Sequence, residues 1–336
     1  MRKRTIYSLL ASSLLFSSYN LANDFDIIAH RGASGYLPEH TLEAATLAFA
    51  QQPDFIEQDV VATKDGVPIV LHDIHLDTVT NVETVYPKRA RSDGRYYAVD
   101  FTLSELRRLR VHERTDRKGE QVFTSRYQGQ HANFTVATFA EHLELITELN
   151  RQFSTNIGVY PEIKSPAWHQ AQGIDISALV LSTLKRFNFA GSNANSYVQS
   201  FDFDELKRLR NELGYKGKLV LLIGENSWQE SATDFNYIRS EAGMREAAKY
   251  VDGIGPWLGH IIDTNALKQG TVKAQPWLAF AHEQQLLLHP YTFRKDALLP
   301  GISEEELLTI LINTVKADGV FTDHIPPVKN RLNTNR

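Results

Sequence analysis

Carboxylates and cations lie at the ends of several short apolar runs in this 336-residue sequence. Glu57 and Asp59 are two positions apart in one run, so both side chains point to the same face of a β-strand. Carboxylates held this close raise each other's pKa unless a cation lies between them. With Glu162 they form a set of hard oxygen ligands that suits Ca²⁺ or Mg²⁺. The alternative is a salt-bridge network with Arg31 and Lys164.

Two histidines from separate segments, His30 and His72, can act as general acid and general base beside such an ion. A histidine at a strand end is, however, also often a structural group. Arg31 and Lys164 supply fixed positive charge, which suits a phosphate. This set of residue types therefore indicates acid–base chemistry on a phosphate ester.

Other polar and aromatic residues allow two interpretations each. Trp257 can line the site or pack in the core, and His289 can line the pocket or be structural. Three further histidines are expected in loops or at the surface, namely His40, His75 and His324.

The elements that must position these residues alternate along the chain. Short apolar runs separated by helical patterns predict βαβ units and a parallel sheet. The predicted strands cover residues 26–30, 55–60, 157–162, 197–201, 218–223, 251–255, 286–291 and 319–323. The predicted helices cover residues 41–51, 138–150, 174–188, 204–213, 239–249, 275–284 and 303–316.

Eight strand–helix units in about 300 residues indicate an α/β fold, a (β/α)₈ TIM barrel. A doubly wound open sheet is the alternative. Active-site groups of such barrels lie at the C-terminal ends of the strands, and the candidate carboxylates and His30 fall there in the predicted strands.

Two segments interrupt the alternation. Residues 68–72 follow the second strand too closely for a parallel crossover, so we predict a hairpin that returns His72 toward the end of strand two. Residues 74–135, with one short helix predicted at 104–110, form a small insertion after strand two. The basic run 88–95 is expected to be solvated, and the alternative is that it steers anionic substrates.

Residues 1–22 have a basic head, an apolar stretch and a small last residue, which is typical of a secretory signal peptide. The alternative is an uncleaved anchor helix, although the stretch is shorter than the roughly 20 residues of a membrane span. Cleavage would leave a barrel domain of residues 23–336 and, with three cations fewer, shift the formal net charge from −4 to −7.

A mildly acidic protein is not expected to bind nucleic acid. The sequence contains no cysteine, which excludes disulfides, thiolate metal sites and a lipoprotein anchor. We therefore expect a periplasmic or secreted protein without a stable membrane anchor. Its oligomeric state stays open.

Taken together, the motifs resemble the glycerophosphodiester phosphodiesterases. The resemblance implies a (β/α)₈ barrel and metal-dependent hydrolysis of glycerophosphodiesters, such as glycerophosphocholine and glycerophosphoethanolamine, to sn-glycerol 3-phosphate and an alcohol. It rests on residues 30–41, 57–59, 64–73, 160–164 and 321–323, while residues 91–102, 252–256 and 289–292 resemble the periplasmic branch in particular.

The resemblance also implies roles for individual residues. The divalent ion, commonly Ca²⁺ in this branch with Mg²⁺ as the alternative, would bind to three carboxylates, and two histidines would be the acid–base pair. The substrate and its phosphate would bind to a separate group of side chains. These sets are Glu57, Asp59 and Glu162 for the metal, His30 and His72 for catalysis, and Arg31, Lys164 and Trp257 for the substrate.

Two competing functions remain at this point. One is a phospholipase D-like lyase on the same scaffold, which would retain a cyclic phosphate product. The other is an exported binding protein without catalytic activity. The sequence also leaves open whether water or the substrate's own glycerol hydroxyl attacks the phosphorus.

Overall fold

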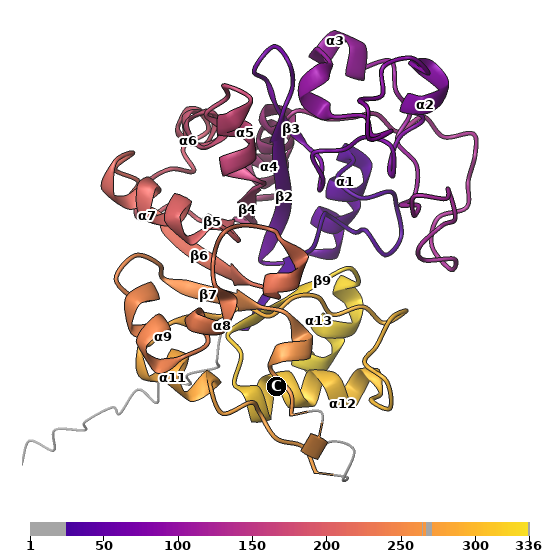
Figure 1. Ribbon diagram of the computed structural model, residues 1–336. Coiled ribbons are helices and arrows are strands. Elements are labelled where there is room, and N and C mark those ends of the chain that lie inside the picture. The colour runs from indigo at the N-terminus through magenta and orange to yellow at the C-terminus, as the bar shows by residue number, and fades with distance from the viewer. Residues whose placement is uncertain (1–24, 264, 267–270, 335–336) are drawn as a thin grey trace, which may run out of the picture.

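Nine strands form one sheet in the computed structural model, which describes residues 25–263, 265–266 and 271–334 (Figure 1). Eight strands are parallel, in the order β8-β7-β6-β5-β4-β2-β1-β9, and β3 pairs antiparallel with β2. The strands are β1 Asp26–Ala29, β2 Phe55–Ala62, β3 Pro68–Val70, β4 Gly158–Ile163, β5 Tyr197–Ser200, β6 Lys218–Ile223, β7 Gly253–Pro256, β8 Leu287–Leu288 and β9 Gly319–Thr322.

Backbone hydrogen bonds bring the two ends of this sheet together. Beside β8, Asp318 N donates to Leu288 O at 2.9 Å. Further along, Phe293 N donates to Phe321 O at 2.8 Å, and Phe321 N donates to Pro290 O at 2.9 Å. The result is a nearly closed α/β barrel, which confirms the predicted (β/α)₈ architecture and excludes the open doubly wound sheet.

Helices surround the strands, and most begin at a polar cap. Thr138 and Glu141 form a reciprocal capping box at the start of α4, and Thr41 caps α1. The helix predicted from Asp204 begins earlier, because Asp202 is its N-cap. The helices are α1 Leu42–Gln51, α2 Val82–Val85, α3 Leu103–Leu106, α4 Phe139–Phe153, α5 Pro166–Ala171, α6 Ile176–Arg186, α7 Phe203–Asn211, α8 Phe235–Ile238, α9 Glu241–Ala247, α11 Leu278–Glu283, α12 Glu304–Thr309 and α13 Ile325–Asn333, with the short turns η1 Ala98–Asp100, η2 Asn226–Trp228 and η3 Leu258–His260 and the π-helix η4 Ile310–Val315.

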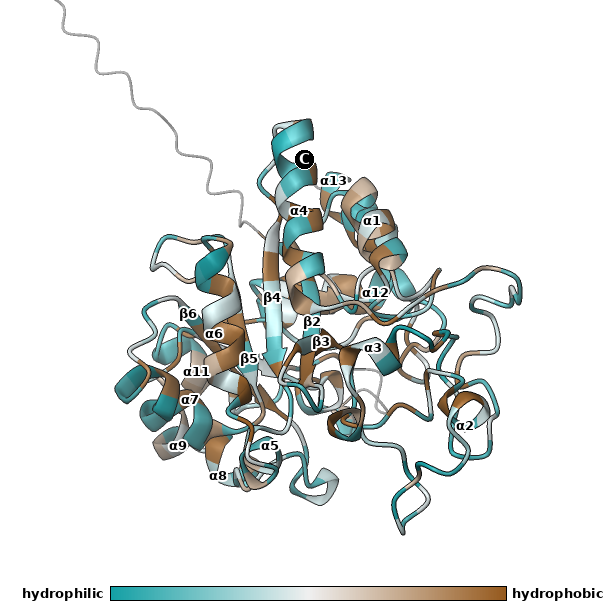
Figure 2. Ribbon diagram, turned by 90° about the horizontal axis from the view of Figure 1, so that it is seen from above, coloured by the Kyte–Doolittle hydropathy of each residue, from teal (hydrophilic) through white to brown (hydrophobic). Residues whose placement is uncertain are grey.

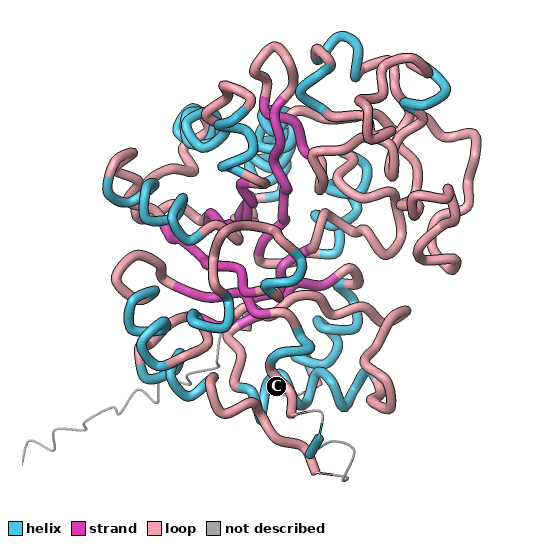
Figure 3. The backbone as a smooth tube through the Cα atoms, viewed as in Figure 1, coloured by secondary structure: helices cyan, strands magenta, loops and turns pink. Residues whose placement is uncertain are grey.

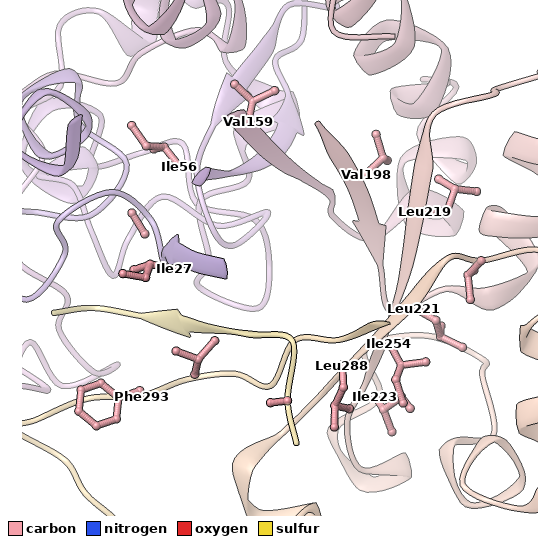
Figure 4. Close-up of a cluster of buried hydrophobic side chains, with 14 of the residues drawn as sticks. Ile27, Ile56, Val159, Val198, Leu219, Leu221, Ile223, Ile254, Leu288 and Phe293 are labelled. Carbon is pink, nitrogen blue, oxygen red and sulfur yellow. The ribbon is translucent and has the colours of Figure 1, made fainter. Parts of the chain in front are cut away.

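The core has an outer and an inner apolar layer. The outer layer lies between the strands and the helices, whose two-sided hydropathy is visible on α4 and α6 in Figure 2. Along β1, Ile27 and Ala29 belong to this layer, whereas Ile28 belongs to the inner layer. Figure 4 shows equivalent outer-layer side chains from neighbouring strands, among them Ile56, Val159 and Val198.

Most of the insertion is loop (Figure 3), yet it has an apolar cluster of its own. Val61 of β2 and Ile69 of β3 contribute to the cluster, so it rests directly on the barrel. The basic run is not simply solvated, because its arginines pair with carboxylates of the insertion. These pairs are Arg89–Glu105 at 2.8 Å, Arg91–Asp100 at 2.7 Å and Arg95–Asp77 at 2.7 Å.

The side chain of Phe101 is fully buried in this second cluster. We expect Phe101→Ala to lower the free energy of unfolding by about 3–5 kcal/mol, because it removes a large buried ring and leaves a cavity. The matched control is Phe153→Ala, since Phe153 is 64% exposed and should change stability by less than about 1 kcal/mol. Urea unfolding measures both, and equal effects would contradict a packed insertion core.

The predicted signal peptide falls outside the described residues and stays a prediction. Within those residues, none of the helices combines the length and apolar composition needed to cross a bilayer.

Candidate active site

A layer of polar side chains lies directly above the inner apolar layer. Ile28 and Tyr160 point into the barrel, and two residues further along the same strands His30 and Glu162 point the same way. Because alternate residues of a strand point to the same side, the inward-pointing residues after the inner apolar layer form a polar layer above it. The same spacing relates Phe55 to Glu57, Tyr197 to Gln199 and Phe321 to Asp323, and Asp59 follows two residues after Glu57.

A cavity of about 170 Å³ opens above this layer. A larger cavity of about 540 Å³ lies in the insertion, but no predicted site residue lines it. The smaller cavity is therefore the candidate site, and both charged and aromatic side chains line it. The lining residues are His30, Arg31, Glu57, Asp59, His72, Glu162, Phe201, Leu222, Trp228, Trp257, Tyr291, Thr292, Arg294 and Phe321.

The three predicted metal ligands meet in this cavity. One oxygen of each of Glu57, Asp59 and Glu162 lies within 4.8 Å of the others, and all three residues are buried. Burial, together with the charge of Asp59, raises the pKa of Glu57 and of Glu162 well above the usual range. Asp59 Oδ1 is buried without a hydrogen-bond partner among the described residues. An orphaned carboxylate oxygen in such a cluster fits a divalent cation.

The alternative salt-bridge network exists as well, but it does not satisfy the cluster. Lys164 Nζ lies 2.8 Å from Glu162 Oε1, and Arg31 Nε lies 3.5 Å from Asp59 Oδ2. These contacts leave Asp59 Oδ1 unpaired. Lys164 is buried but is not among the residues that line the cavity.

His30 is held by an aspartate from the last strand. Its Nδ1 lies 2.6 Å from Asp323 Oδ1, and its Nε2 lies 3.8 Å from Glu57 Oε2. Despite burial, Arg294, His30 and Arg126 keep the pKa of Asp323 well below the usual range, so its carboxylate accepts and His30 Nδ1 donates. Burial and Arg31 lower the pKa of His30 to about 3. The ring is therefore neutral, with its proton on Nδ1, and His30 is one of the residues that line the cavity.

His72 is also held by an aspartate, in this case the next residue in the chain, Asp73. The predicted hairpin is confirmed by the antiparallel pairs of β2 and β3, and Leu71 N donates to Asp59 O at 2.9 Å. This return places His72 at the cavity, where its Nδ1 donates to Asp73 Oδ1 at 2.8 Å. Burial and Arg31 lower the pKa of His72 to about 4.

Arg31 is fixed from both its backbone and its side chain. Its φ of 59° lies in the left-handed region, and its backbone N donates to Glu57 Oε2 at 2.9 Å. Its Nη1 donates to Glu39 Oε2 at 3.0 Å. The buried Nε has no hydrogen-bond partner among the described residues, which leaves a donor beside the cavity.

Sequence reasoning missed several residues of the site. His40 and His324 are buried rather than exposed, and His40 Nε2 donates to Asp59 Oδ2 at 2.7 Å. His289 is also buried and binds the Tyr160 hydroxyl, outside the cavity. The position of His40 within the 30–41 motif was the available signal. Glu39 lies in the same motif, whereas three charged partners of the site carried no sequence signal, namely Arg114, Arg126 and Arg294.

Comparison with known proteins gives consistent matches. The family model of the "Glycerophosphoryl diester phosphodiesterase family" matches residues 30–326. The chain is 39% identical to a glycerophosphodiester phosphodiesterase of Haemophilus influenzae over 96% of both chains. It is 35% identical to the enzyme of the same name from Treponema pallidum over 90% of both chains.

Solved structures show the same fold at low sequence identity. A crystal structure from Silicibacter pomeroyi superposes with a TM-score of 0.69 and 21% identity, covering 93% of this chain and 94% of that one. A phosphodiesterase from Oleispira antarctica, solved in complex with the product sn-glycerol-3-phosphate, gives a TM-score of 0.60 and 18% identity, covering 92% of this chain and 96% of that one.

Proposed function

This chain belongs to the glycerophosphoryl diester phosphodiesterase family, and on that premise we propose that it hydrolyses glycerophosphodiesters to sn-glycerol 3-phosphate and an alcohol. One observation carries the proposal beyond family membership. Two histidines, each with its Nδ1 bound to an aspartate, face one cavity with three buried carboxylates.

We assign a divalent cation, most simply Ca²⁺, to Glu57, Asp59 and Glu162. Hard carboxylate oxygens and the orphaned Asp59 Oδ1 support this choice. When bound, such a cation stabilises negative charge on phosphoryl oxygens. Mg²⁺ is the alternative that a metal titration distinguishes.

The two histidines then move the protons. Their Nδ1 atoms are occupied by aspartates, so the Nε2 of one accepts a proton from the attacking hydroxyl and the Nε2 of the other donates one to the leaving alcohol. Their lowered pKa values leave both rings neutral, which is the form that can accept a proton, while the donating histidine must first take up a proton. The attacking hydroxyl belongs either to water or to the glycerol of the substrate.

The remaining wall of the cavity binds the substrate. Arg31 offers to the phosphate its Nε, which makes no hydrogen bond among the described residues, and Lys164 supports the site through Glu162. Trp257 contributes to the aromatic side together with Trp228, whose ring centroid lies 5.3 Å away. These rings offer apolar contact to the glycerol or to the head group.

An assay with glycerophosphocholine tests this proposal and its competitors. We expect sn-glycerol 3-phosphate and choline to form in Ca²⁺, and turnover to fall at least a hundredfold after thorough chelation and to return when Ca²⁺ is added. ³¹P NMR follows the phosphorus. A persistent cyclic phosphate would instead support the lyase, and no turnover of any glycerophosphodiester with Ca²⁺ or Mg²⁺ would support the binding protein.

We also propose that the protein is exported to the periplasm or secreted. The basic head and apolar stretch of residues 1–22 support this. Cell fractionation with an antibody against residues 23–336 tests it, and retention of the full-length chain in the cytoplasm would contradict it.

A further inference from the structure

One arginine of the insertion contacts the aspartate of each histidine–aspartate pair, His72–Asp73 and His30–Asp323. Arg114 Nη1 donates to Asp73 Oδ2 at 2.7 Å, while the other oxygen of Asp73 accepts from His72. Arg114 is only 16% exposed and is fixed by a second carboxylate, because its Nε and Nη2 donate to Glu39 at 3.0 and 2.6 Å. A chain of hydrogen bonds therefore runs from Arg114 of the insertion through Asp73 to His72.

Arg126 repeats this arrangement on the other side of the site. Its Nη2 donates to Asp323 Oδ2 at 2.6 Å, while Asp323 Oδ1 accepts from His30 at 2.6 Å. Arg126 is only 6% exposed, and two bonds to Asp296, at 2.8 and 3.1 Å, fix its guanidinium. Arg114 and Arg126 come from separate parts of the insertion, yet each binds the aspartate oxygen that the histidine does not use.

Neither arginine is among the residues that line the substrate cavity. Both therefore reach the histidines through the aspartates and not through the substrate. An aspartate is held in one rotamer and kept ionised when an arginine pairs with its second oxygen, whether it is buried, as Asp323 is, or partly exposed, as Asp73 is. An ionised, fixed aspartate in turn fixes the histidine tautomer and the direction of its Nε2.

We propose that Arg114 and Arg126 are positioning residues, which hold the orientation of His72 and His30 through Asp73 and Asp323. The insertion then contributes to the active site in addition to packing against the barrel. This inference rests on the acid–base roles proposed above. The two aspartates differ in the number of arginines that they pair with. Asp323 also accepts from Arg294 of the barrel at 2.7 Å, whereas Asp73 pairs with Arg114 alone among the arginines of the described residues.

The test replaces each arginine by methionine, which keeps the length of the side chain but removes its charge and donors. We expect Arg126→Met to lower kcat about tenfold with KM within about twofold, and Arg114→Met to lower kcat about a hundredfold. Arg114→Met should also raise KM, because it releases Glu39, which binds Arg31. Lysine at either position should restore part of kcat.

Arg95→Met is the matched control. Arg95 is also an insertion arginine that pairs with an aspartate, Asp77, at 2.7 Å, but this pair does not contact His30 or His72. Its kcat should stay within about twofold of wild type. A kcat for Arg126→Met and Arg114→Met no lower than that of this control would overturn the proposal.

A double-mutant cycle separates positioning from a general loss of packing. If Arg126 acts through Asp323, then Arg126→Met should have little further effect on kcat in the Asp323→Asn background. An undiminished tenfold loss in that background would refute the mechanism. The same cycle applies to Arg114 and Asp73.

A second readout does not need turnover. ¹⁵N NMR of the imidazoles reports the tautomer, and we expect a fixed Nδ1–H form of His30 and His72 in wild type that becomes a mixture in the methionine variants. If the wild type hydrolyses nothing, the proposed function fails while the tautomer spectra still decide the positioning. Unchanged tautomers in both variants would overturn it.

Discussion

His30→Ala is expected to lower kcat by about 10²–10⁴-fold, because it removes one of the two histidines proposed to transfer protons. The fold should survive. Asp323 loses one hydrogen bond but keeps Arg126 and Arg294, so no unpaired carboxylate is left in the interior. Steady-state kinetics with glycerophosphocholine measures the loss, and the thermal midpoint reports the fold.

A histidine outside the cavity serves as the control for this variant. His289 is as buried as His30 and follows β8, but it contacts Tyr160 and does not line the cavity. His289→Gln should therefore lower stability while kcat stays within a few-fold of wild type. A near-normal kcat for His30→Ala, or equal losses in both variants, would remove His30 from the mechanism.

The second large effect is expected for Asp59→Asn. The variant keeps the size of the side chain and an oxygen for His40, but it takes a negative charge from the carboxylate cluster. We expect Ca²⁺ affinity to fall at least about a hundredfold and kcat/KM with it, since even changes around metal ligands are known to reduce affinity by 10–100-fold. Calorimetry with Ca²⁺ measures the affinity directly.

Stability provides an independent check on the same cluster. Buried carboxylates that repel each other destabilise the protein without a cation, so chelation should lower the thermal midpoint of wild type. It should not lower that of Asp59→Asn. Glu205→Gln is the control, because Glu205 is buried but pairs with Arg208 on α7, and this variant should bind Ca²⁺ normally. Equal Ca²⁺ affinity of wild type and Asp59→Asn would contradict the assignment.

The fold and the centre of the site were predictable because both follow from local periodicity. Alternation in β1 puts His30 on the same face as Ile28, and the spacing of Glu57 and Asp59 does the same for β2. The short turn before β3 required a hairpin, which in turn placed His72. These inferences needed only neighbouring residues and the rule for barrel active sites.

The rest depended on contacts between distant segments, for which the sequence has no period. Nothing near Arg126 indicates that it binds Asp323, which lies 197 positions later. His40 lies in a turn, as predicted, but it is buried and its ring bonds to Asp59, with the backbone in the left-handed region at φ 61°. The strand predicted at 286–291 is also shorter in the structure, where β8 is Leu287–Leu288 and Pro290 lacks the N–H that a ladder needs.

The aromatic floor of the barrel limits how molecules can enter and leave. Tyr160 and Tyr197 stack at 4.8 Å, and Phe55 and Phe321 each lie 5.0 Å from one of them, so the rings seal the barrel below the charged layer. Substrate, water and both products must then share one mouth at the opposite end. A departing alcohol must leave through the same opening by which the next substrate enters. We therefore expect sn-glycerol 3-phosphate, the proposed product, to act as a competitive inhibitor when it accumulates.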